Sequence, residues 1–230
     1  ALGNGGNAML SLSQNATVSG TGDASIGART VGDISVTVGD DSKVVEFDIN
    51  EVNANVIGEG NASIGVSDIG DVTLVAGDGL TGSGNLQFDF HADAVVTGTG
   101  NASVGNLTIG DVSMTAGDEA NSSAWQSFHV SIEATVSGTG DATLGDLTVG
   151  NVSMIYGHDS DFSNVDLDFD YNAFVTGTGD ALVGNVTIGD LSITAGDSGD
   201  ANLSISAEVT ARADIGNATI GNVVVGDISI

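Results

Sequence analysis

The stretch Gly100-Asn101-Ala102-Ser103-Val104-Gly105-Asn106-Leu107-Thr108-Ile109-Gly110-Asp111-Val112-Ser113-Met114 recurs along this chain in six near copies. The copies begin at Gly22, Gly60, Gly100, Gly140, Gly179 and Gly216, so they lie 37 to 40 residues apart and fill the chain. Repeats of this length are typical of proteins that stack one unit on the next. We expect a single repeat domain, 1–230, with units at about 1–40, 41–78, 79–118, 119–158, 159–197 and 198–230.

The composition predicts an all-β fold. The chain has 35 glycines, no proline and 4 % aromatic residues. Val, Ile and Thr are concentrated in the copies, which favours many short strands separated by glycine turns. No segment has the i, i+3, i+4 spacing of apolar residues that indicates a helix. With so few aromatic residues, we expect a thin and mostly aliphatic core.

Each repeat has two halves with different patterns. In the first half of the third repeat every second residue is apolar: Leu86, Phe88, Phe90, Ala92, Ala94 and Val96. Across the repeats, this half also holds nearly all the aromatic residues. That alternation indicates a strand with one buried face. In the second half glycine recurs every five residues, at Gly105 and Gly110, each time followed by Asn or Asp. Because five is odd, each Gly-Asx pair must form a bulge or corner if the apolar residues are to face one side.

Equivalent positions in the copies carry equivalent residues. A small column reads Ala24, Ala62, Ala102, Ala142, Ala181, Ala218; a β-branched column reads Val31, Ile69, Ile109, Val149, Ile188, Val225; a hydroxyl column reads Ser35, Thr73, Ser113, Ser153, Ser192, Ser229. Stacking in register would bury the first two columns and pair the third. A fourth column departs from the rule, with Arg29 and Ser67 where later copies have Leu107, Leu147, Val186 and Val223, so we expect the first two repeats to be partly uncovered there.

Two architectures satisfy this pattern. In a β-solenoid-like rod, like positions stack about 4.8 Å apart and each repeat forms one large or two ordinary coils. In a long antiparallel β-meander or sandwich, the two halves of each repeat pair as a hairpin across Gly-Thr-Gly. The strict columns favour the solenoid.

The charge of the chain is strongly negative. Thirty-one acidic residues face only Lys43, Arg29 and Arg212, which gives a net charge of −28. Such a surface repels phosphate, so the sequence argues against nucleic-acid binding. No apolar run approaches the roughly 18 residues needed to span a bilayer, and we expect no membrane insertion. There is no cysteine, and the chain starts at Ala1, as expected of a processed or excised chain.

Stacking would also align acidic residues, and aligned carboxylates repel. One column reads Asp33, Asp71, Asp111, Asn151, Asp190, Asp227; a second reads Asp23, Asn61, Asn101, Asp141, Asp180, Asn217; a third contains Asp40, Asp78, Asp118 and Asp197. Water, the Asn interruptions, backbone N–H groups at the glycine corners or a cation must offset the repulsion. Calcium is the natural cation because it prefers carboxylate, amide and carbonyl oxygens. The turns resemble those of glycine- and aspartate-rich calcium β-rolls, although the tandem Gly-Gly-x-Gly-x-Asp nonapeptide is missing.

Nine Asn-x-Ser/Thr sequons make glycans a second expectation. They are at Asn15, Asn61, Asn101, Asn106, Asn121, Asn151, Asn185, Asn202 and Asn217. If an N-glycosylating cell exports the protein, some of these would be decorated. Asn121 and Asn202, in or near variable linkers, are the best candidates, and corner-forming asparagine is the alternative reading.

The sequence predicts no enzyme. It has no catalytic triad order, phosphate loop or H-E-x-x-H motif, and its acids recur in every copy although a catalytic pair is a singular feature. His91, His129 and His158 do not share a register, so we expect surface histidines and not a three-histidine metal cluster.

The leading functional prediction is an extracellular or cell-surface structural protein, a filament subunit whose partner is another copy of itself. A first strand with Met9, Leu10 and Leu12 and a last strand with Ile228 and Ile230 would expose strand edges at the ends of the stack. Head-to-tail addition would cover these edges, and a heterologous contact that does not close gives a filament. The alternatives are a calcium-dependent adhesin stalk or binding module and, with weaker support from the incomplete Thr-x-Thr pattern, an ice-binding surface.

Overall fold

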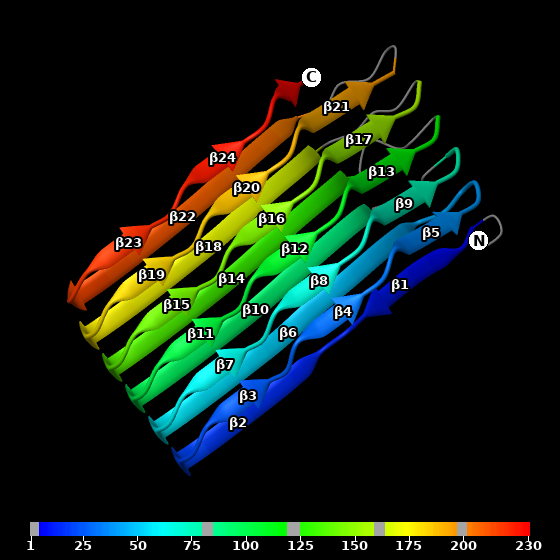
Figure 1. Ribbon diagram of the computed structural model, residues 1–230. Helices are drawn as coiled ribbons and strands as arrows, with labels where there is room; N and C mark the ends of the chain where they lie inside the picture. Colours follow the sequence, from blue (N-terminus) through cyan, green and yellow to red (C-terminus); the bar gives the residue numbers. More distant parts are fainter. Residues whose placement is uncertain (1–4, 80–84, 119–124, 159–163, 197–201) are drawn as a thin grey trace.

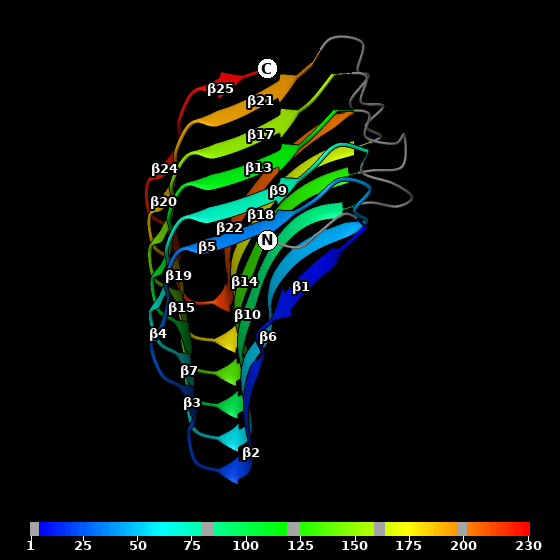
Figure 2. The ribbon, with the colours of Figure 1, turned by 90° about the vertical axis from the view of Figure 1, so that its right-hand side faces the viewer.

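The protein is a parallel β-solenoid (Figures 1 and 2). The computed structural model describes residues 5–79, 85–118, 125–158, 164–196 and 202–230, in which each short-strand sheet has six strands, one from each repeat. Every strand pair in these ranges is parallel. The solenoid prediction is therefore confirmed, and the meander or sandwich is wrong.

Four sheets run the length of the stack. The long sheet contains β1 (Asn7–Ser11), β2 (Gln14–Thr21), β6 (Val44–Glu59), β10 (Asn85–Thr99), β14 (Trp125–Thr139), β18 (Asn164–Thr178) and β22 (Leu203–Ile215). The second contains β3 (Ala24–Ile26), β7 (Ala62–Ile64), β11 (Ala102–Val104), β15 (Ala142–Leu144), β19 (Ala181–Val183) and β23 (Ala218–Ile220). The third contains β4 (Arg29–Val31), β8 (Ser67–Ile69), β12 (Leu107–Ile109), β16 (Leu147–Val149), β20 (Val186–Ile188) and β24 (Val223–Val225). The fourth contains β5 (Ile34–Val38), β9 (Val72–Ala76), β13 (Val112–Ala116), β17 (Val152–Tyr156), β21 (Leu191–Ala195) and β25 (Ile228–Ser229).

Each sequence repeat forms one large coil. A long strand crosses one side of the coil, turns back at Gly-Thr-Gly, and three short strands return along the other side (Figure 2). Glycine is required at this turn, because Gly100 has φ +147° and an added Cβ would lie 1.8 Å from the carbonyl oxygen of Gly60 in the coil before. The predicted corners lie between the short strands, at the Gly-Asx pairs.

The core lies between the long sheet and the three short ones. As predicted from the alternation, Leu86, Phe88 and Val96 are fully buried. Phenylalanine rings of four coils lie close together, with ring centroids 5.7 Å apart for Phe47–Phe88, 5.0 Å for Phe88–Phe128 and 5.4 Å for Phe128–Phe169. The first three share one column, and Phe169 lies in the neighbouring column, beside Val130. Because the buried phenylalanines lie in the first half of the repeat, the expectation of a mostly aliphatic core fits the second half better, apart from the buried Tyr156.

The irregular Arg29 column is filled differently from our expectation. Ser67 is buried, so the second repeat is not uncovered at this point. The small side chain of Ser67 leaves space through which Arg29 reaches two coils along the stack, to 5.6 Å from the centre of the Phe90 ring, while Arg29 donates a 2.8 Å hydrogen bond to Ser67 Oγ. Burial lowers the pKa of Arg29.

In the part of the chain that the structure describes, no helix is long and apolar enough to cross a bilayer.

Candidate functional site

Ladders of Asp and Asn side chains run along the corners of the solenoid. In the Asp33 column, the Oδ1 atom of each residue accepts a hydrogen bond from the backbone N–H of its counterpart in the next coil. The N···O distances are 3.1 Å for Asp71 to Asp33, 2.9 Å for Asp111 to Asp71, 2.8 Å for Asn151 to Asp111, 2.9 Å for Asp190 to Asn151 and 2.9 Å for Asp227 to Asp190. Backbone N–H groups, one of the four sources of stabilisation that we considered, therefore hold the stacked carboxylates.

Two further predicted columns follow the same rule. The Asp23 column is bonded in this way from Asp23 through Asn61, Asn101, Asp141 and Asp180 to Asn217, at 2.7–2.9 Å. The Asp40 column is bonded through Asp78 and Asp118 to the N–H of His158, so His158 takes the aspartate position, as its sequence register indicates. Asp197 lies outside the described residues.

Sequence reasoning missed a fourth ladder. Asn106 Oδ1 accepts the N–H of Asp146 at 2.9 Å, Asp146 that of Asn185 at 2.7 Å, and Asn185 that of Asn222 at 3.0 Å. The first two coils have Ala28 and Val66 at this corner, which hid the column. The signal was present in the five-residue spacing, because Gly105-Asn106 precedes Gly110-Asp111 by five residues.

Glycine in each Gly-Asx pair makes room for this bond. A Cβ at Gly110 would lie 2.3 Å from Asp71 Oδ1, and one at Gly150 would lie 2.5 Å from Asp111 Oδ1. A side chain there would therefore displace the carboxylate from the neighbouring N–H. The pair works across coils: the glycine of one coil accommodates the Asx of the coil before it.

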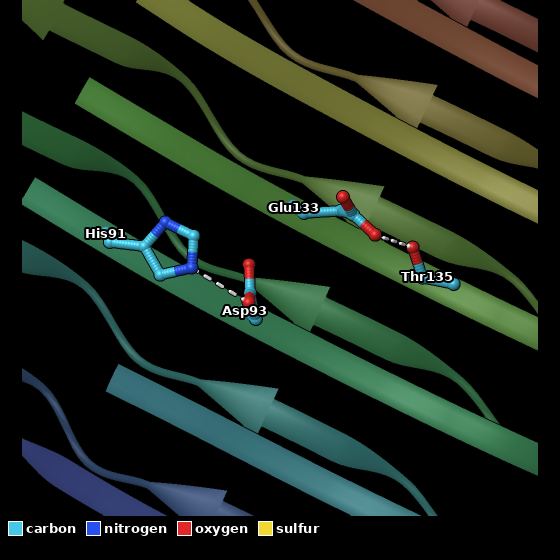
Figure 3. A network of polar contacts seen from close by, with 4 residues as sticks. All are labelled: His91, Asp93, Glu133 and Thr135. Atoms are coloured by element: carbon cyan, nitrogen blue, oxygen red, sulfur yellow. Dashed lines mark hydrogen bonds and ion pairs between the residues drawn. The ribbon is translucent and has the colours of Figure 1, made fainter. Parts of the chain in front are cut away.

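The outward face of the long sheet carries the second group of polar residues. His91 Nε2 lies 2.9 Å from Asp93 Oδ2 on the same strand, and Thr135 donates to Glu133 in the same i, i+2 arrangement (Figure 3). The hydrogen bond with Asp93 raises the pKa of His91. As predicted, His91 and His129 face outward and lie two positions apart, because Asp89, not His91, pairs with His129.

His129 lies between acids of the two neighbouring coils. Its Nδ1 lies 3.9 Å from Asp89 Oδ1 and its Nε2 lies 3.9 Å from Asp168 Oδ2. One ligand atom each of His129, Asp168 and Asp170 lies within 4.8 Å of the others, so an imidazole and two carboxylates could hold a divalent cation there. Asp48, two coils before His129 in the same column, is buried, and burial together with Asp89 and Glu46 raises its pKa to about 6.

Eight of the nine sequon asparagines lie in described, exposed positions. They are Asn15, Asn61, Asn101, Asn106, Asn151, Asn185, Asn202 and Asn217; Asn121 lies outside the described residues. Six of the eight are ladder members, and ladder asparagines of consecutive coils, such as Asn61 and Asn101, are stacked neighbours. Two glycans would not fit at that spacing, so adjacent ladder asparagines cannot both be decorated. Of the two best candidates, Asn202 lies exposed and outside the ladders, and its glycosylation stays a prediction.

The two ends of the stack expose core positions and strand edges. At the C-terminal end Val225 is 40 % and Ile228 53 % exposed, whereas the equivalent Ile109 and Val112 of an inner coil are 1 % exposed. At the N-terminal end Met9, Leu10 and Leu12 are exposed. Each of the four sheets therefore ends in strands with one unpaired edge at either end of the described structure.

The predicted assembly residues thus lie at the ends, the corner acids form hydrogen-bonded ladders, and the acids of the long sheet gather around His129. Comparison with protein-family models, with curated proteins and with solved structures gives no match for this chain.

Proposed function

We propose that this chain is a structural protein that polymerises end to end into a filament outside the cell. The observation that carries the proposal is the pair of open ends, where four parallel sheets stop with unpaired edges and exposed apolar residues. Such edges are templates for pairing with another chain. The sheets are parallel and run through the whole stack, so the two ends differ and the contact between copies is heterologous.

Charge supports growth along one axis. The net charge of −28 makes the sides of two rods repel one another, while the ends are dominated by apolar residues and backbone groups. We therefore expect assembly to need salt, which screens repulsion beyond a Debye length of about 8 Å at physiological ionic strength. The location outside the cell rests on the acidity and the sequons, and it is part of the proposal.

Electron microscopy and sedimentation velocity of chain 1–230, over a range of concentrations in 0.1 M and 1 M salt, test this function. We expect uniform fibres that grow longer with concentration. The variant Val225→Lys places a charge on the exposed end of the core and should prevent growth. Leu182→Lys makes a similar change at a residue that is 42 % exposed on the side of an inner coil, and it should leave growth intact. Monodisperse short rods under every condition would refute the filament.

Calcium binding by the aspartate columns stays a prediction. The corner ladders offer another explanation of the acids, because each Oδ1 already accepts a backbone N–H. Adding calcium or a chelator in the same microscopy experiment separates the two. Fibres that disappear with the chelator would favour the calcium-dependent alternative, and fibres that persist would assign the acids to the ladders.

A further inference from the structure

The corner ladders have a direction, and their two ends are complementary. In the Asp23 and Asp33 columns throughout, and in the fourth column from Asn106 onward, the Oδ1 atom of one coil accepts an N–H of the next coil. Within the described residues, the ladders therefore end at the C-terminal coil with acceptors that have received no such bond, on Asn217, Asn222 and Asp227. The Asp23 and Asp33 ladders begin at the N-terminal coil, where no side-chain oxygen of the described residues bonds the backbone N–H of Asp23 or Asp33. The fourth ladder begins at Asn106, because the first two coils have Ala28 and Val66 at that corner.

At two glycines of the first coil, Gly27 and Gly32, neither a neighbouring atom nor the backbone conformation requires glycine. Nothing lies within 4 Å of a Cβ added at Gly27 or Gly32, and neither has a φ in the left-handed region. At the equivalent positions of the last coil, a Cβ on Gly221 would lie 2.8 Å from Asn185 Oδ1 and one on Gly226 would lie 2.4 Å from Asp190 Oδ1. Gly32 thus leaves open the space that an Asx side chain of the preceding coil fills at Gly70, Gly110, Gly150, Gly189 and Gly226. Gly27 leaves open the space that is filled in the same way at Gly145, Gly184 and Gly221.

The core of the first coil is hollow on the same side. A cavity of about 270 Å³ is lined by Leu12, Ser13, Gln14, Arg29, Thr30, Val31 and Ile49. In the stacking register, Val223 is the equivalent of Arg29 and Val225 the equivalent of Val31. A last coil placed before the first would therefore bring two exposed valines, 49 % and 40 % accessible, to the lining of this cavity.

We propose that the C-terminal coil of one copy, 202–230, docks before the N-terminal coil of a second copy in the register of the inner coils. This inference rests on the filament function proposed above. Ala218 then pairs with Ala24, Val225 with Val31 and Ser229 with Ser35. Asn217, Asn222 and Asp227 accept the N–H groups of Asp23, Ala28 and Asp33. The joint continues all four sheets, and with six layers in each copy the axial rise per subunit is about 29 Å, from a spacing of about 4.8 Å per layer.

Cysteine pairs test the register directly, since the chain has no cysteine of its own. Ser25 and Thr219 are exposed and face each other in the proposed joint, because both belong to the column of Ser63 and Leu182. Paired residues of neighbouring strands lie about 4.8 Å apart, which is within the Cα–Cα range of about 4.4–6.8 Å for a disulfide. The double variant Ser25→Cys/Thr219→Cys should therefore give a disulfide-linked ladder of oligomers on mild oxidation. The mismatched pair Ser25→Cys/Ser229→Cys, with its second cysteine on a different sheet, should not.

Gly32→Ala tests the corner. The substitution should leave the melting temperature of the dilute chain unchanged or slightly higher, and it should raise the concentration needed for assembly at least tenfold, because the Cβ takes the place of the docking Asp227 carboxylate. Thr108→Ala, an exposed change at the equivalent position of an inner coil, should not alter the concentration needed for assembly.

The outcomes separate the two proposals. Fibres without the Ser25–Thr219 disulfide, or fibres unaffected by Gly32→Ala, would overturn this register and leave the filament function standing. A wild-type chain that forms no fibres would overturn both.

Discussion

Gly110→Ala is the sharpest test of the corner ladders. The added Cβ would lie 2.3 Å from Asp71 Oδ1 and 2.9 Å from the backbone N of Asp71 and the carbonyl carbon of Gly70, which are distances that real Cβ atoms do not adopt. The carboxylate must therefore leave the N–H of Asp111, to which it is bonded at 2.9 Å. Gly110 has no left-handed φ, so the substitution adds no backbone strain of that kind.

The lost bond sets a lower bound on the expected destabilisation, because the two backbone contacts must also be relieved. A hydrogen bond to a charged acceptor contributes about 1.5–3 kcal/mol, and because Asp71 and Asp111 are exposed we expect a value near the lower end, about 2 kcal/mol. For a chain of this length, 1 kcal/mol shifts the melting temperature by about 2–4 °C, so Gly110→Ala should melt about 4–8 °C below the wild type.

Gly32→Ala is the matched control. It makes the same change at the same corner of the first coil, where nothing lies within 4 Å of the new Cβ. Without a clash, the substitution acts mainly on the unfolded chain, which loses conformational freedom, and should stabilise the protein by about 0.4–1 kcal/mol. Circular dichroism melts of both variants at a concentration too low for assembly measure the difference. If the two substitutions shift the melting temperature equally, the corner bond does not stabilise the coil and our reasoning is wrong.

Two further predictions concern buried polar groups. Replacing Arg29 and Ser67 together by leucine, the residue of the same column at Leu107 and Leu147, should raise the melting temperature by a few degrees. The reason is that the Arg29 guanidinium is partly buried, with one hydrogen bond to Ser67 among its described contacts. Arg29→Leu alone should raise the melting temperature less, and a double variant that melts below the wild type would contradict this. Burial and neighbouring acids raise the pKa of Asp48 to about 6. Between about pH 4 and pH 6 the folded protein therefore keeps a proton on Asp48 that the unfolded chain has already lost. The contribution of Asp48 to the free energy of unfolding then falls as the pH rises from about 4 through 6. Asp48→Asn should reduce this fall in urea denaturation at pH 4, 5, 6 and 7, whereas Asp68→Asn, the same change of charge at an exposed position, should not; equal pH profiles for the two variants would rule out Asp48 as the cause.

Sequence reasoning predicted the fold because the features that define a solenoid, its repeat length and its stacked columns, can be read directly along the sequence. The glycine spacing sets the coil length, and the columns of Ala102 and Ile109 show which residues stack. The parallel register of these columns is the one in the structure. The alternation from Leu86 to Val96 also placed the buried face correctly, because a strand has a period of two.

The ladders and the histidine cluster could be predicted only in part. Stacked acids imply a source of stabilisation, but which one operates depends on the position of Asp71 Oδ1 relative to a backbone N–H one coil away, and no spacing encodes that side-chain geometry. The group of His129, Asp168 and Asp170 spans two coils at different sequence offsets. Its members come together only once the register of β14 with β18 is known, and the linker between those strands varies in length among the repeats, which hides the register.

Most of this surface is repeated, and repetition constrains what it can do. A corner such as Gly110-Asp111 occurs in every coil, so its hydrogen bond serves the stack as a whole and marks no single binding place. At the two ends of the described structure the stacking partner on one side is missing, and the proposed joint uses this. In that joint the acceptors of the last coil would lie in register with the N–H donors of the first coil, because both belong to the same stacked columns. Under the filament proposal, self-recognition would therefore need no separate binding site: the interactions that add one coil to the next within a chain would also add one chain to the next.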